Sequence, residues 1–132
     1  MASLSDFTTS LANNVIEAKF IRRRPKAGAP ATRRAFITNS TSILNSAKGK
    51  TVLGFNGFGT GVAGLGFFPA NKNLVLAWDI LWQSFRLFGA EGSQIITKIP
   101  VSTEKEIEVF WQYFEKNIQS MSPEQKLQFM NS

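Results

Sequence analysis

The residues best suited to chemistry in this sequence are five arginines that lie within 13 positions of one another. They fall in two groups, Arg22 to Arg24 and Arg33 with Arg34, and the stretch between them holds Lys26, prolines and small residues. A guanidinium group presents several N–H donors in one plane and can bind two phosphate oxygens at once. The spacing therefore indicates a basic segment that binds an anionic partner.

The positive charge of the chain is concentrated around this segment. The net charge is +6, yet residues 1–50 hold nine Lys and Arg against Asp6 and Glu17, a balance of +7, and the rest of the chain is at −1. Such a local excess favours a local anionic partner over a general role in solubility. Two partner classes stay open, namely nucleic acid (DNA or RNA) and an acidic surface of another protein.

The missing residue types argue against catalysis. The chain contains no histidine and no cysteine, which removes the usual acid–base group near neutral pH, the thiolate nucleophile and the ligands of most zinc sites. We expect a binding protein that is not an enzyme and uses no metal or cofactor. No segment resembles a secretory signal or reaches the roughly 18–20 apolar residues of a membrane span, so we expect no membrane contact and a cytoplasmic location.

Apolar periodicity predicts a short helix at residues 3–13, then a series of strands. The strands are expected at Val15–Ile21, Arg33–Asn39, Thr51–Phe55, Asn73–Asp79, Ser84–Phe88 and Gln94–Ile99. The first two would form a hairpin, with residues 22–34 as an exposed, mobile arm. Residues 40–50 are polar and indicate a turn-rich connection.

Helix signals take over after Pro100. Thr103 and Glu106 form a capping box, and apolar residues recur at helical spacing from there to Ile118. Ser122 and Pro123 begin a second short helix. The sequence therefore predicts a single α+β domain over residues 1–132, in which residues 15–99 form a small barrel or curled antiparallel sheet and residues 102–130 a helical cap.

Residues 54–68 alternate six glycines with phenylalanines. The glycines match neither a P-loop nor a dinucleotide-binding pattern. Phe55, Phe67 and Phe68 are expected in the core, because large aromatic side chains are mostly buried. The alternatives are a platform on which bases stack, to which Phe58 would belong, and a surface for self-association.

The central strands resemble a known family of small barrels. The run LVLAWDILWQSFRLF, followed by a turn and IITKI, is similar to the SH3-like barrels of the WYL-type group and their relatives encoded by bacteriophages. The resemblance implies an SH3-like fold and binding of a ligand or nucleic acid, with Arg86 at the family's aromatic–Arg position. The Trp-Tyr-Leu signature is missing here, and Gly89-Ala90-Glu91 replaces the second arginine-containing part of the motif.

Charge and composition together predict a nucleic-acid-binding protein that uses its basic hairpin, and the resemblance suggests a phage-encoded one, acting in the host cytoplasm. The residues expected to contact nucleic acid are Arg22, Arg23, Arg24, Lys26, Arg33, Arg34, Trp82 and Arg86. Trp82 is included because its ring could stack on a base, whereas Arg86 could equally form a structural ion pair with Asp79. The alternative is a viral structural or assembly protein, or one that binds a host protein, and a homo-oligomer fits that reading.

Overall fold

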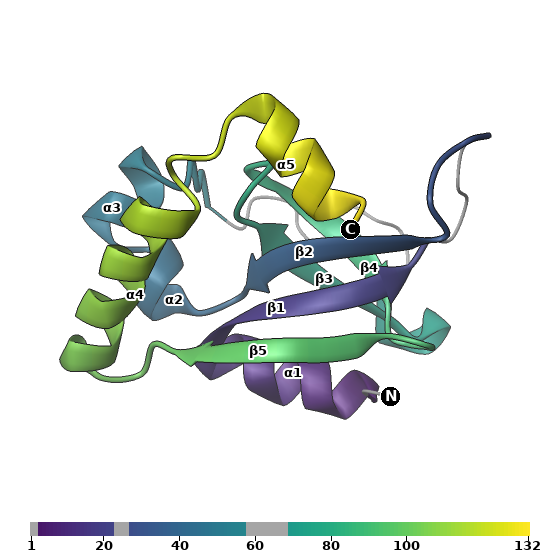
Figure 1. Cartoon of the computed structure of the whole chain (residues 1–132). Helices are drawn as coiled ribbons and strands as arrows, with labels where there is room; N and C mark the ends of the chain where they lie inside the picture. The colour runs from purple at the N-terminus through teal and green to yellow at the C-terminus, as the bar shows by residue number, and fades with distance from the viewer. Residues whose placement is uncertain (1–2, 23–26, 58–68) are drawn as a thin grey trace.

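The computed structural model describes residues 3–22, 27–57 and 69–132, which form one antiparallel sheet with helices on both faces (Figure 1). In chain order the elements are α1 (Leu4–Asn13), β1 (Asn14–Ile21), β2 (Thr32–Thr38), α2 (Thr41–Leu44), α3 (Ala47–Thr51), the 3-10 helix η2 (Pro69–Lys72), β3 (Leu74–Asp79), β4 (Ser84–Gly89), β5 (Gln94–Pro100), α4 (Glu104–Asn117) and α5 (Pro123–Met130). The predicted α+β class, with helices closing the chain after the strands, is confirmed.

The sheet has the strand order β4-β3-β2-β1-β5 and is open. β1 and β2 form a regular hairpin, and β5 pairs with the other edge of β1. By contrast, only two residue pairs join β2 to β3, Ile37 with Asp79 and Thr38 with Trp78. The sheet is therefore the curled form of the prediction and is not closed into a barrel, since β4 and β5 remain its two edges.

The curl brings distant strands into contact on the inner face of the sheet. Phe20 of β1 stacks on Phe88 of β4, with ring centroids 4.5 Å apart, although β2 and β3 separate these strands in the sheet. α1 begins at a capping box on Ser3 and covers this face. Its Phe7 and Leu11 are fully buried, so α1 fills the space that the curl encloses.

The outer face of the sheet packs against the two C-terminal helices. Both begin at the predicted capping boxes, on Thr103 and on Ser122. Phe129 of α5 stacks on Phe36 of β2 with ring centroids 4.9 Å apart and an interplanar angle of 4°. The inward side of α4 supplies the buried residues Phe110, Trp111 and Phe114. The outer face therefore carries a second core, separate from the one around α1.

The segment after β2 differs from its prediction. Residues 40–50, expected to be a turn-rich connection, contain α2 and α3, and residues 51–55 do not form the expected strand. The Ser46 side chain accepts the N–H of Gly49 and begins α3. Gly54 then has φ +69°, a left-handed conformation that interrupts an extended strand.

The glycine- and phenylalanine-rich segment is described only at its start. Phe55 is 3% exposed and packs in the outer core, with its ring edge-on to Trp78 at 5.3 Å. The prediction that Phe55 is a core residue is therefore confirmed. Phe58, Phe67 and Phe68 lie outside the described residues.

Candidate nucleic-acid interface

The basic segment lies at the end of the β1–β2 hairpin, opposite the end of the molecule where α4 packs (Figure 1). The pairing continues past the strands, because the Arg22 backbone N–H donates to the Ala31 carbonyl at 2.8 Å. The predicted hairpin is thus confirmed on both of its sides. Arg23, Arg24 and Lys26 lie outside the described residues.

Strand geometry sends the two arginines of β2 to opposite faces of the sheet. Successive side chains of a strand alternate between faces. Ala35 and Ile37 belong to the core around α1, whereas Phe36 belongs to the core under α5. Arg33 therefore shares the inner face with the former pair, and Arg34 shares the outer face with Phe36.

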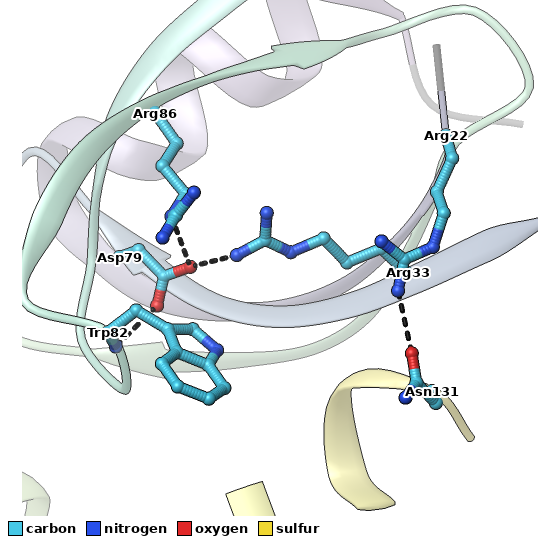
Figure 2. Close-up of polar contacts among 6 residues, drawn as sticks. All are labelled: Arg22, Arg33, Asp79, Trp82, Arg86 and Asn131. Carbon is cyan, nitrogen blue, oxygen red and sulfur yellow. Dashed lines mark hydrogen bonds and ion pairs between the residues drawn. The ribbon is translucent and has the colours of Figure 1, made fainter. Parts of the chain in front are cut away.

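On the inner face, Arg33 forms an ion pair with Asp79 at the end of β3 (Figure 2). Arg33 Nη2 donates to Asp79 Oδ2 at 2.7 Å, and the two side chains are 16% and 0% exposed. The Trp82 backbone N–H donates to the other carboxylate oxygen at 3.1 Å, and Arg86 Nε lies 3.7 Å from Oδ2. One buried carboxylate thus links β2, β3, the following turn and β4.

Burial dominates the ionisation of this ion pair. Burial raises the pKa of Asp79, against the lowering effects of the Trp82 backbone N–H, Arg33 and Arg86. Burial also lowers the pKa of Arg33; Asp79 opposes that shift, and the charges of Arg86 and Arg22 add to it. The Asp79 carboxylate therefore faces two guanidinium groups, and Arg22 adds a third positive charge near Arg33.

On the outer face, Arg34 forms an ion pair with Glu17 of β1, to which its Nε also donates a hydrogen bond. Its guanidinium lies 4.8 Å from the centroid of the Phe129 ring, and its Nη1 donates to Ser132 Oγ at 3.2 Å. Arg34 thus contacts both β1 of the hairpin and the C-terminal helix α5, and it holds the two together. The expectation that Arg33 and Arg34 extend as part of an exposed arm is wrong, because both lie within β2 and neutralise buried carboxylates.

The remaining described candidates differ in their surroundings. Arg22 Nη2 donates to Asn131 Oδ1 at 2.7 Å (Figure 2). Its Nε–H, like that of Arg33, is buried and has no hydrogen-bond partner among the described residues. The Arg86 side chain is 42% exposed and pairs with Asp79, as its structural reading predicts. Trp82 is half-buried against the outer core. Arg33 and Arg86 therefore meet at Asp79, with Trp82 on the adjoining turn, whereas Arg22 reaches towards α5.

Two acidic residues determine how much basic charge remains for a ligand. The sequence predicts Asp79 as a partner of Arg86, but its short contact is with Arg33. The sequence prediction assigns no role to Glu17. A single acidic residue on one strand of a hairpin whose other strand carries adjacent arginines is, however, a signal for a diagonal cross-strand ion pair. Glu17 pairs directly with Phe36 in the register, two positions from Arg34.

Comparison with known proteins yields no relative, since no family model, no curated protein and no solved structure matches the chain. The resemblance to WYL-type barrels therefore stays a prediction. No helix among the described residues is long and apolar enough to cross a membrane. Within the same residues, no group of three or more acidic side chains is arranged to hold a metal ion.

Proposed function

We propose that this protein is a non-enzymatic nucleic-acid-binding protein that contacts the phosphate backbone with the end of its β1–β2 hairpin. The supporting observation is the charge that remains after internal pairing. Residues 19–34 carry seven Lys and Arg and no Asp or Glu. In the part of the chain that the structure describes, only Arg33 and Arg34 of this segment have carboxylate partners. Among the described residues this leaves Lys19 and Arg22 for a ligand, and the sequence adds Arg23, Arg24 and Lys26, which lie outside the described residues.

Contacts of this kind give affinity with little sequence preference, because phosphate groups are the same at every base. Four neutralised phosphates, from Arg22 to Arg24 and Lys26, would give a slope of log K against log salt of about −3 to −4 on duplex DNA. Arg33 and Arg34 add little to this slope, because their charges are already balanced inside the fold.

Fluorescence anisotropy with labelled single- and double-stranded DNA and RNA, at several salt concentrations, tests the proposal. Changing Arg23, Arg24 and Lys26 together to glutamine should weaken binding and reduce the slope to about −1. The matched control changes three exposed lysines of α3 and α4 to glutamine and should keep the steep slope, since it removes the same charge elsewhere. The control positions are Lys50, Lys105 and Lys116.

The proposal fails if none of the four nucleic acids binds at about 50 mM salt, where phosphate contacts are strong. It also fails if the control weakens binding as much as the hairpin variant, because the affinity would then come from net charge alone. The four ligands together decide between DNA and RNA and between single and double strands.

A second candidate function, self-assembly, is supported by the edge strand β5. No strand of the described residues pairs with its outer edge, and Ile96 on this strand is 41% exposed. An open edge with exposed β-branched residues can pair with another chain. Size-exclusion chromatography with light scattering separates the candidates. Self-assembly would be the supported function if the protein forms a discrete oligomer that does not respond to added nucleic acid and that Ile96→Lys dissociates.

A further inference from the structure

A cavity of about 340 Å³ lies beside the described end of β1, where it meets the start of β3 and the end of β4. Its lining combines the apolar side chains of Ile21 and Leu74 with the cations of Arg22 and Lys72 and the carboxylate of Glu91. The cavity therefore joins two positive groups and one negative group around an apolar surface.

Arg22 has a buried hydrogen-bond donor that no described residue satisfies. Its Nη2 donates to the neutral side chain of Asn131, but its Nε–H is buried and has no partner. A buried donor without an acceptor is costly, and native proteins rarely keep one unless a water, ion or ligand completes it. An acceptor from outside the chain, bound at Arg22, would satisfy this donor.

The charges around this position favour an anionic acceptor. Arg22 and Arg86 both lie close enough to Arg33 for their charges to act on it, and Arg33 and Arg86 share the single carboxylate of Asp79 (Figure 2). Arg33 and Arg86 are in contact with Asp79, whereas the side chain of Arg22 bonds to a neutral amide. Among the described residues, Arg22 is therefore a cavity-lining cation with no carboxylate partner.

We infer that this cavity binds a phosphate group, with Arg22 donating its Nε–H to a phosphate oxygen. The inference rests on the proposed function for the source of the phosphate, which is the nucleic-acid backbone. A phosphate both satisfies the buried donor and offsets the excess charge, whereas a water does only the first. Glu91 repels the same anion and lowers its affinity.

Isothermal titration with inorganic phosphate, with ionic strength held constant by sodium chloride, measures this site directly. Arg22→Gln should weaken phosphate binding about tenfold or more, because a charge-assisted hydrogen bond is lost. Glu91→Gln should tighten it about two- to fivefold, because a nearby like charge is removed. Lys116→Gln, an exposed change on α4, is the matched control and should leave the affinity unchanged.

The inference is overturned if phosphate gives no saturable heat, or if Arg22→Gln and Glu91→Gln both bind phosphate as the unchanged protein does. Glu91 is exposed, so its variant keeps the test valid even if Arg22→Gln fails to fold. A labelled oligonucleotide identifies the source of the phosphate. If both variants bind the oligonucleotide with the affinity of the unchanged protein, this site is refuted but the proposed function is not. Phosphate binding with the expected pattern and no oligonucleotide binding supports the site and refutes the proposed function.

Discussion

Replacing Arg33 with glutamine should destabilise the fold although Arg33 belongs to a segment whose sequence resembles a surface arm. The change leaves the Asp79 carboxylate, which is 0% exposed, with Arg86 at 3.7 Å as its nearest remaining cation. Removing one partner of a buried ion pair costs about 3–5 kcal/mol, because the other charge stays buried without compensation. A domain of this size is stable by only about 5–15 kcal/mol, so the loss should be easy to measure.

Urea unfolding followed by circular dichroism measures the effect. With a slope of about 1–3 kcal/mol per molar urea, the midpoint of Arg33→Gln should fall by at least about 1 M. Arg86→Gln is the matched control, because Arg86 contacts the same carboxylate but its side chain is 42% exposed. A pair that open to solvent contributes about 0–1 kcal/mol, so the control midpoint should move little.

The pH dependence separates lost charge pairing from lost packing. Without Arg33, the pKa of Asp79 rises further above its usual value of about 3.9. Between that value and the raised one, the folded state holds more protons than the unfolded state, so stability falls as pH rises. The loss of unfolding free energy caused by Arg33→Gln should therefore be largest near pH 7 and become smaller towards pH 4. A deficit equal at both pH values, or smaller than about 1 kcal/mol at pH 7, would refute this reasoning.

Three further outcomes are expected. Burial and, secondarily, the Glu17 carboxylate raise the pKa of Tyr113, the single tyrosine, from 10.0. The absorbance of tyrosinate should therefore titrate above pH 10. The free energy of unfolding should fall as pH rises through 10, because the folded state keeps the tyrosine proton to a higher pH than the unfolded state. Gly49→Ala should lower the free energy of unfolding in urea by about 1–3 kcal/mol, because the new methyl group overlaps with the backbone carbonyl oxygen of Ile43. The same change in a helix with free space at that position would increase stability. Phe129→Ala should cost about 1–3 kcal/mol in the same assay, because α5 loses its stacked ring on β2.

Local sequence patterns predict most elements of this fold because each is encoded within a few residues. The near-continuous apolar run before Asp79 is typical of a strand buried on both faces, and β3 occupies it. Thr103 with Glu106 satisfies the first free N–H groups of a helix, and α4 begins there. By the same reasoning residues 51–55 were expected to be a strand, but the left-handed Gly54 prevents it.

The candidate site could be predicted only in part because its contacts join distant parts of the chain. Arg33 and Asp79 are 46 positions apart, and their contact depends on how β2 and β3 meet at only two residue pairs. No local pattern carries that geometry. Glu17 and Arg34 are closer in sequence, yet their pairing requires the hairpin register, which alternation alone does not determine. Arginine spacing therefore identifies the basic segment but does not show which of its charges are already balanced.

The hairpin register separates the arginines that stabilise the fold from those that remain for a ligand. Adjacent residues of a strand point to opposite faces, so Arg33 and Arg34 each enter a covered face and each requires its own acid. Arg22 follows the last residue of β1, and its partner is a neutral amide. Salt should act differently on the two groups, because buried pairs are screened much less than contacts with an external phosphate. Nucleic-acid affinity should therefore fall steeply with salt while the free energy of unfolding changes little.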